Sequence, residues 1–406
     1  MFKKRIFVVM MILMFVSLSI SGVFAQDTVK IGTLVPMTGG LASYGQFTRN
    51  GTLLAQKIIN DQGGILGGKK LELVNVDTQT NPQSGVDGAQ KLVSVSGVNA
   101  IVGALSSGVT IPVAESVTVP GEVVLISPAS TSPILTTLDD NGYVFRTVPS
   151  DSLQGVVAAN LASNRLDYDK LAIIYVNNDY GQGLNDAIVE QFEKNGGEIT
   201  ASIAFEPNKV SYRSELMEAA KDSPDALLLV AYTDDGGITI IRQALENGYF
   251  DKFIFTDGLK APEITEGVEQ YLEGMYGTAP TSMPGGNGPE IFKNLYEKEF
   301  GEIPPKPYID TSFDATFVLA LAIEKAGSTD GTAIRDALGE VLSEDGMVVN
   351  INEWNKAKDL IKAGQKIRYE GASGPVLFNQ AGDSMGAIGI WKIKDGDIVN
   401  DSVEVQ

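Results

Sequence analysis

Two clusters of hydroxyl side chains follow short apolar runs in the first half of the chain. Ser106 and Ser107 come after the run at 100–104, and the second cluster, at 127–132, comes after the run at 123–126. Hydroxyl groups and the free backbone N–H groups at a helix start together bind carboxylates or phosphates. Capping of a helix is the competing explanation, but a cap needs only one such residue. Two clusters at neighbouring strand ends favour an anion site.

Carboxylates and tyrosines take the equivalent positions in the second half. Tyr180, Tyr232 and Asp257 each follow an apolar run, and Asp151 follows the run at 145–149. An Asp in such a place is by itself usually a solvated cap or turn residue. As a set facing hydroxyl clusters, these residues predict a site for a ligand with a carboxylate at one end and an ammonium group beside it.

The elements that must position these residues alternate between strand and helix. In the first half we predict strands at 29–35, 71–76, 100–104 and 123–126, and helices at 46–61 and 84–96. The same order restarts near Lys170, with strands at 171–176, 199–204 and 226–231 and helices at 184–194 and 212–221. This alternation predicts an α/β fold with parallel sheets, which bind ligands beyond the carboxyl ends of their strands.

The rest of the chain has a less regular pattern. We predict helices at 290–300 and 313–326, strands within 375–390, and a turn at 177–183. Asp395-Gly396-Asp397 predicts a hairpin turn, because the further ligands of a calcium loop are missing. A single core rarely grows beyond about 250–300 residues, so we expect two Rossmann-like lobes.

Composition excludes several kinds of chemistry. The 406 residues include no Cys and no His, so disulfides, thiolate nucleophiles, imidazole ligands and Ser-His-Asp catalysis are excluded. We expect no metal and no cofactor. The 51 acidic and 31 basic residues give a net charge of −20, which argues against nucleic acid as a partner.

The first residues have the pattern of a secretory signal peptide. Lys3, Lys4 and Arg5 precede an apolar run at 6–20, and small residues lead up to Ala25. A membrane anchor is the alternative, but this run is short for a span of about 20 residues. We therefore expect residues 1–25 to be removed by cleavage after Ala25 and the protein to be exported. The lack of Cys excludes a lipoprotein anchor, which favours a free periplasmic protein.

Several motifs, spread in order over nearly the whole chain, resemble one known family. They are Ile31-Gly32-Thr33, Tyr44-Gly45, Gly63-Gly64, Ile126-Ser127-Pro128-Ala129, Phe145-Arg146-Thr147, Gln154-Gly155, Asp179-Tyr180-Gly181, Phe313-Asp314-Ala315 and Gly374-Pro375. The chain is similar to the periplasmic leucine/isoleucine/valine-type (branched-chain amino acid) substrate-binding proteins of ABC transporters. These proteins have the type I periplasmic-binding-protein fold.

The resemblance implies two lobes joined by a hinge of three chain crossings, near 146–148, 275–279 and 370–375. Lobe one would comprise 26–147 and 277–372, and lobe two 148–276 and 373–402. The ligand would lie in the cleft between them. Family members often carry a disulfide in lobe one, which this chain cannot form.

The resemblance also implies a role for each site residue. Ser107, Thr131 and the backbone of Ala129 match the family's carboxylate binders, and Asp257 and Asp151 match acidic positions near the ligand amino group. Asp257 stands where the branched-chain binders have Glu. The expected cleft aromatics are Tyr44, Tyr180 and Tyr232.

The expected function is capture of an amino acid, branched-chain or similar, and its delivery to the membrane subunits of an ABC permease by a monomeric protein. Alternative ligands are an amide, urea or another small carboxylate, and the protein could serve a membrane sensor. A glycosidase can work with two carboxylates alone. With only Trp354 and Trp391 the chain offers no sugar platform, so we expect no enzyme.

Overall fold

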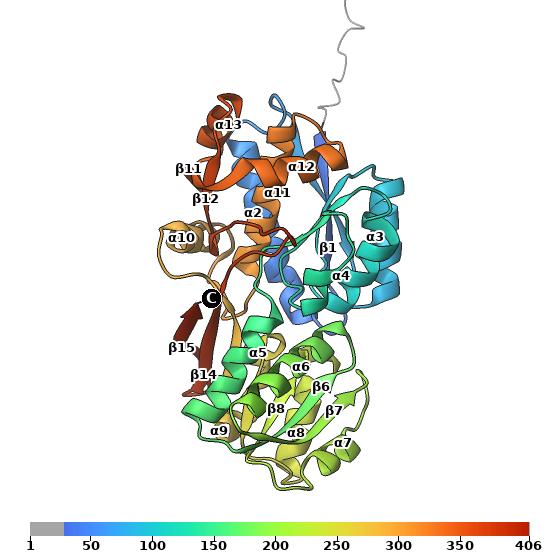
Figure 1. The fold of residues 1–406 in the computed structure, drawn as a ribbon, viewed down its shortest axis with the longest axis vertical. Coiled ribbons are helices and arrows are strands. Elements are labelled where there is room, and N and C mark those ends of the chain that lie inside the picture. Colours follow the sequence, from blue (N-terminus) through green and yellow to red (C-terminus); the bar gives the residue numbers. More distant parts are fainter. Residues whose placement is uncertain (1–27, 406) are drawn as a thin grey trace, which may run out of the picture.

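The computed structural model describes residues 28–405, so the predicted signal peptide lies outside the described residues. Two lobes are stacked along the long axis of the molecule, each with a sheet flanked by helices (Figure 1). Within 28–405, no helix is long and apolar enough to cross a membrane.

The first lobe is built around a five-stranded parallel sheet in the order β2-β1-β3-β4-β5. Its strands are β1 (Thr28–Val35), β2 (Lys70–Asp77), β3 (Ala100–Val102), β4 (Val124–Ser127) and β5 (Val144–Arg146). Its N-terminal helices are α2 (Ala42–Asp61), α3 (Pro82–Ser94) and α4 (Ser107–Val113). Every residue of β3 and β4 is buried, as expected where helices cover both faces of a parallel sheet.

The second lobe contains a seven-stranded sheet in the order β15-β14-β10-β9-β8-β6-β7. Its strands are β6 (Lys170–Val176), β7 (Glu198–Phe205), β8 (Ala226–Val230), β9 (Phe253–Phe255), β10 (Tyr276–Thr281), β14 (Ala387–Lys394) and β15 (Asp397–Val405). Its helices are α5 (Asp151–Asn160), α6 (Asp179–Lys194), α7 (Arg213–Ala219), α8 (Gly237–Glu246) and α9 (Glu269–Leu272). Only β14 and β15 join this sheet in antiparallel fashion.

The chain passes between the lobes three times, after β5, after β10 and before β14. Between the second and third passages it adds to the first lobe α10 (Gly288–Phe300), α11 (Ile309–Ala326), α12 (Gly331–Val341) and α13 (Trp354–Lys362). A small sheet completes this part, with β11 (Leu342–Asn350), β12 (Ile367–Gly371) and β13 (Gly374–Pro375). We expected the second-lobe segments to end at 276 and 402, whereas β10 runs to Thr281 and β15 to Val405.

Helix α11 ties the third passage to the first lobe. The carboxylate of Asp314 accepts hydrogen bonds from the Tyr369 hydroxyl (2.8 Å), from the Ala372 N–H (2.7 Å), and from the Ser373 N–H (2.8 Å) and hydroxyl (2.6 Å). The Asp314 of the sequence motif is therefore a structural residue that holds the segment at 369–373 in place.

The predicted α/β fold with two lobes is confirmed. Three helix starts differ from the prediction by four residues or more: α2 begins at Ala42, α11 begins at Ile309, and the predicted turn at 177–183 contains the first turn of α6. Helix α6 begins early because the Asn178 side chain accepts a hydrogen bond from the Gly181 N–H at 2.9 Å. The predicted hairpin turn at 395–397 is confirmed between β14 and β15.

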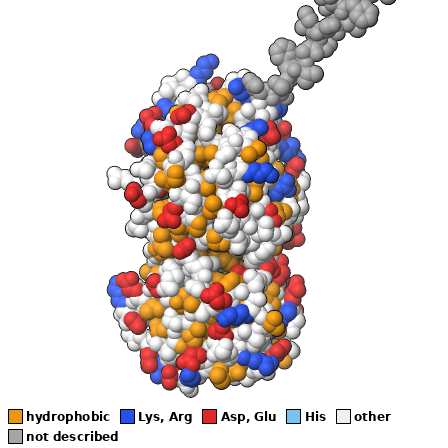
Figure 2. Space-filling model, turned by 90° about the vertical axis from the view of Figure 1, so that its right-hand side faces the viewer, with side chains coloured by type: hydrophobic (Ala, Val, Ile, Leu, Met, Phe, Trp, Pro, Cys, Tyr) orange, Lys and Arg blue, Asp and Glu red, His pale blue; other side chains and the backbone are white. Residues whose placement is uncertain are grey.

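The two lobes touch each other beside the cleft. The Ser43 N–H donates to Asp234 Oδ2 at 3.0 Å, and the Ser43 and Thr233 hydroxyls lie 2.8 Å apart. Lys306 Nζ lies 2.6 Å from Glu263 Oε1. Figure 2 shows the waist of the molecule where the lobes meet. The structure is thus a closed arrangement of the lobes.

Candidate ligand-binding site

A small enclosed cavity lies between the lobes, at the carboxyl ends of both parallel sheets. The free volume of this cavity is about 10 Å³, enough for about one water molecule. Its walls are formed by Leu41, Tyr44, Leu105, Ser107, Ala129, Tyr180, Tyr232, Asp257, Gly258 and Tyr308. Six of the eight residues expected at the site line this cavity; Thr131 and Asp151 do not, but both are buried.

The first-lobe wall presents hydrogen-bond donors that are free to meet an anion. Ser107 Oγ accepts from the Ser132 N–H at 3.2 Å, which leaves its own O–H available. The Thr131 hydroxyl is buried without a hydrogen-bond partner among the described residues. The Ala129 N–H reaches Ser127 Oγ only at 3.4 Å. Of the three groups predicted to bind an anion, Ser107 and Ala129 line the cavity, and Thr131 is buried without lining it.

Other hydroxyls of the same clusters hold the loops together. Ser127 Oγ donates to the Ala104 carbonyl at 2.7 Å, and Ser130 Oγ donates to the Leu105 carbonyl at 3.1 Å. Arg146, at the first passage between the lobes, donates to the carbonyls of Thr131 and Ser132 at 2.9 Å each. Part of each cluster therefore shapes the loop, and only part faces the cavity.

The second-lobe wall is organised around the carboxylate of Asp257, which is 3% exposed. Its Oδ1 accepts from the Tyr180 hydroxyl at 2.7 Å and from Gln154 Nε2 at 2.8 Å. Its Oδ2 accepts from the Tyr308 hydroxyl at 2.5 Å. Tyr180 also stacks on Tyr232, with ring centroids 5.2 Å apart. Donors thus hold both carboxylate oxygens of Asp257, which itself forms part of the cavity wall.

Asp151 is a second buried carboxylate near the first. It is fully buried, and neither carboxylate oxygen has a hydrogen-bond partner within residues 28–405. Its N–H donates to the Thr131 carbonyl at 2.8 Å, which places it beside the hydroxyl cluster. Burial and the charge of Asp257 raise the pKa of Asp151, while the Thr131 hydroxyl and Arg146 act in the opposite direction.

A cation would stabilise the ionised carboxylates of the second-lobe wall. Burial raises the pKa of Asp257, and the hydrogen bonds from Tyr308, Tyr180 and Gln154 counteract that increase. Two buried carboxylates close to each other are costly when both are ionised, and Arg146 offsets only part of that cost at Asp151. An ammonium group placed in the cavity would offset that cost, and the hydroxyls of the opposite wall would meet an attached carboxylate.

Two residues around Asp257 were missed by the sequence analysis. Gln154 lies one helical turn after Asp151, and this spacing, which puts both on one face of α5, was a usable signal. Tyr308 comes from the first lobe and directly precedes α11, in a left-handed conformation with φ of 74°. It follows a proline-rich segment without periodicity, so no sequence pattern pointed to it.

Comparison with known proteins agrees with this architecture. The chain is 29% identical to a leucine-, isoleucine-, valine-, threonine- and alanine-binding protein of Pseudomonas aeruginosa, over 82% of this chain and 87% of that protein. It is 30% identical to an amino acid binding protein of the same organism, over 87% and 94% of the two chains. The crystal structure of a leucine-binding protein from Thermotoga maritima superposes with a TM-score of 0.79 at 25% identity, covering 93% and 98%.

The fold defines a two-lobed protein with a small cavity between its lobes, lined by tyrosines, a serine hydroxyl and a buried carboxylate. The family model described as periplasmic binding protein matches residues 28–358, and the chain belongs to this family. The resemblance inferred from the sequence motifs is thereby confirmed.

Proposed function

We propose that this protein captures an amino acid, branched-chain or similar, in the interlobe cavity and delivers it to an ABC-type membrane permease. The observation that carries the proposal is the pairing of two walls. Ser107 and Ala129 of one lobe line the same cavity as Asp257 of the other, and the Thr131 hydroxyl and the Asp151 carboxylate are buried without hydrogen-bond partners among the described residues. The similarity to amino-acid-binding relatives supports the same ligand class.

The two walls suggest how the ligand would lie. Its carboxylate would accept hydrogen bonds from the Ser107 and Thr131 hydroxyls and the Ala129 N–H. Its ammonium group would meet Asp257 and Asp151. Each hydrogen bond to a charged group contributes about 1.5–3 kcal/mol, so three of them with modest apolar burial reach the roughly −8 kcal/mol of a micromolar complex.

The remaining walls of the cavity favour a ligand whose side chain is uncharged. Leu41 and Leu105 contribute only apolar atoms to the cavity. The Tyr44 hydroxyl donates to the Asp257 carbonyl at 3.2 Å, and the Tyr232 hydroxyl pairs with Ser106 Oγ at 3.1 Å. Because both phenol groups already have partners, mainly ring surface is left for the ligand side chain.

Ligand capture would couple to closure of the lobes. With only about 10 Å³ open in this arrangement, the lobes must lie further apart than they do here, both for an amino acid to enter and for the cavity to hold it. The hydroxyl wall would bind the carboxylate first, and closure would bring Asp257 onto the ammonium group. Closure is driven to the extent that the ligand binds the closed form better than the open one.

The route and the partners are part of the same proposal. Export with cleavage after Ala25 would deliver a monomeric protein to the periplasm. The closed, loaded protein would then dock on the membrane subunits of the permease.

Calorimetric titration tests this function. The protein, unfolded and refolded to remove any carried-over ligand, is titrated with L-amino acids, their amides and small carboxylates. We expect saturable binding of an L-amino acid with an apolar side chain, and loss of most of the affinity for the analogue without an amino group. Binding of that analogue with equal affinity, or no binding of any amino acid by folded protein, would contradict the proposal.

A further inference from the structure

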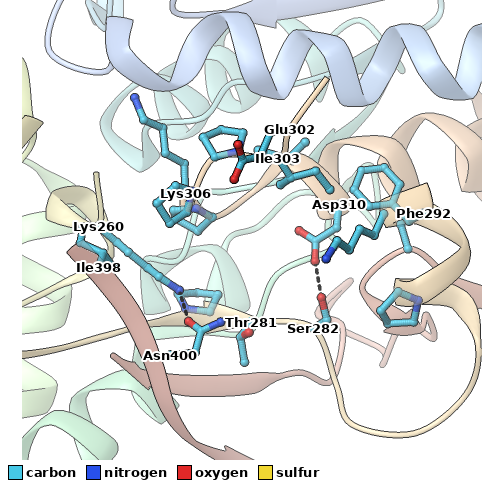
Figure 3. A pocket seen from close by; sticks show the side chains of 18 of the residues that line it. Lys260, Thr281, Ser282, Phe292, Glu302, Ile303, Lys306, Asp310, Ile398 and Asn400 are labelled. Carbon is cyan, nitrogen blue, oxygen red and sulfur yellow. Dashed lines mark hydrogen bonds between the residues drawn. The ribbon is translucent and has the colours of Figure 1, made fainter. Parts of the chain in front are cut away.

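A second, larger cavity lies where two of the three chain passages run between the lobes (Figure 3). Its free volume is about 420 Å³, whereas that of the interlobe cavity is about 10 Å³. Lys260 and Asn400 line it from the second lobe, and Phe292 and Asp310 from the first. A cavity of this size accommodates a small molecule.

Two opposite charges line this cavity without pairing with each other. Lys260 is 6% exposed, and its Nζ donates to Asn400 Oδ1 at 3.0 Å. Asp310 accepts from the Ser282 hydroxyl at 2.6 Å and from the Thr311 N–H at 2.9 Å. In the part of the chain that the structure describes, neither charge takes part in an ion pair. Figure 3 shows the two groups on opposite sides of the cavity.

The charge of Lys260 is poorly compensated for a buried group. An ammonium group has three donors, and Asn400 uses one of them. Burial lowers the pKa of Lys260 to about 8, and the attraction of Asp310 opposes this decrease, so the amine is still largely protonated at neutral pH. A buried cation held mainly by a neutral amide is costly, and an anionic group beside it would offset that cost.

The other walls combine apolar and charged side chains. The apolar ones include Pro280, Phe292, Ile303, Pro304, Pro307 and Ile398, and the charged ones are Lys293, Glu297, Glu302 and Lys306. The cavity therefore combines an anion-binding group, a cation-binding group and an apolar surface. Since the two charges belong to different lobes, a molecule that contacts both would also fix the lobes relative to each other.

We propose that this hinge cavity is a second binding site for an α-amino acid with an apolar side chain. The ligand carboxylate would pair with Lys260, its ammonium group with Asp310, and its side chain would lie on the proline and Phe292 surface. Because the cavity changes with the angle between the lobes, occupancy here and in the interlobe cavity is coupled, and the coupling is reciprocal. The proposal rests on the hinge residues alone, independently of the ligand assigned to the interlobe cavity.

Equilibrium dialysis with labelled L-leucine tests the proposal by counting bound equivalents on the refolded full-length chain. Wild-type protein should bind two equivalents. Lys260→Met and Asp310→Asn should each lose the hinge equivalent, and Asp257→Ala should retain it while losing the other. The matched control is Lys394→Met, which changes an exposed lysine outside the cavity and should leave two equivalents.

The variants also separate failure of this proposal from failure of the proposed function. One equivalent that persists in Lys260→Met and disappears in Asp257→Ala overturns the hinge site and leaves the interlobe site standing. One equivalent that disappears in Lys260→Met and persists in Asp257→Ala supports the hinge site and contradicts leucine binding between the lobes. If the wild-type protein binds no leucine although circular dichroism and a cooperative thermal transition show that it is folded, the hinge site is overturned.

Discussion

The two lobes share one architecture but present opposite chemistry to the cavity between them. Each has a parallel sheet flanked by helices, and each lines the cavity with residues that follow strand ends. The first lobe contributes Ser107 to the cavity wall and the buried Thr131 hydroxyl, whereas the second contributes Asp257 to the wall and the buried Asp151 carboxylate. The repeated fold therefore positions a site, and the loop residues decide its chemistry.

The difference also assigns a different energetic role to each wall. A buried neutral hydroxyl left without a partner costs about 1–3 kcal/mol, whereas buried carboxylates of like charge cost more until a cation arrives. The second-lobe wall should therefore contribute more to ligand affinity and to pH dependence than the first-lobe wall. The following experiments test that asymmetry.

The largest effect is expected for Asp257→Asn. The substitution keeps the shape of the side chain and removes the charge that faces the ligand ammonium group, a loss of about 4 kcal/mol or roughly a thousand-fold in affinity. Calorimetric titration with the preferred amino acid measures it, and Asp257→Glu serves as the charge-retaining control. Affinity within threefold of wild type in Asp257→Asn would mean that the second-lobe wall does not bind the amino group.

The next largest effect concerns stability and pH at Asp235, a second-lobe carboxylate at the lobe interface. Burial, together with the neighbouring Asp234, raises the pKa of Asp235 to about 7 from 3.8. The folded state holds the proton of Asp235 more tightly than the unfolded state. The stability that the protonated carboxyl contributes is therefore complete below about pH 4 and is lost as the pH rises through 7. Asn cannot ionise, so wild-type protein should lose about 3 kcal/mol relative to Asp235→Asn between pH 4.5 and 8.

Denaturant unfolding of both proteins at the two pH values measures this difference. The comparison between variant and wild type cancels the titration of the other carboxylates. Parallel pH profiles would show that Asp235 ionises in the folded protein as it does in the unfolded chain.

Smaller effects are expected on the first-lobe wall. Ser107→Ala and Thr131→Val should each lower affinity about tenfold, since each removes one hydrogen bond to a charged ligand group. Ser127→Ala is the contrasting variant, because its hydroxyl holds the Ala104 carbonyl and faces no ligand. It should lower the melting temperature and leave affinity nearly unchanged. If all three variants behave alike, the division of the cluster into binding and loop-shaping hydroxyls is wrong.

The smallest effect is expected for Tyr308→Phe, which deletes the first-lobe phenol that reaches the second-lobe carboxylate. Tyr180 and Gln154 still hold Asp257, so we expect a loss of about fivefold, or about 1 kcal/mol. Tyr44→Phe is matched to it, because Tyr44 also crosses the cleft but donates to the Asp257 backbone carbonyl. An equal loss of affinity in the two variants would show that the Tyr308 contact with the carboxylate has no special role.

Much of the fold and part of the site could be predicted from the sequence. The alternation of strands and helices along the chain follows from local periodicity, and strand-end residues such as Ser107 and Asp257 could be named because parallel strands bring their carboxyl ends to one edge. The start of α6 was missed because its cap, Asn178, resembles an ordinary turn residue. Tyr308 was missed because it approaches Asp257 from a segment 51 residues later, in the other lobe.

By itself the sequence determined the class of elements, their repeated order, the lack of thiol and imidazole chemistry, and the two sets of strand-end residues. These properties depend on residue type and on spacing within a few tens of residues. Only the tertiary structure decided which hydroxyls stay free, that Asp151 is buried without a hydrogen-bond partner, and that Lys260 and Asp310 line one cavity. Those outcomes depend on contacts between segments that meet through three passages between the lobes, and no local pattern records such contacts.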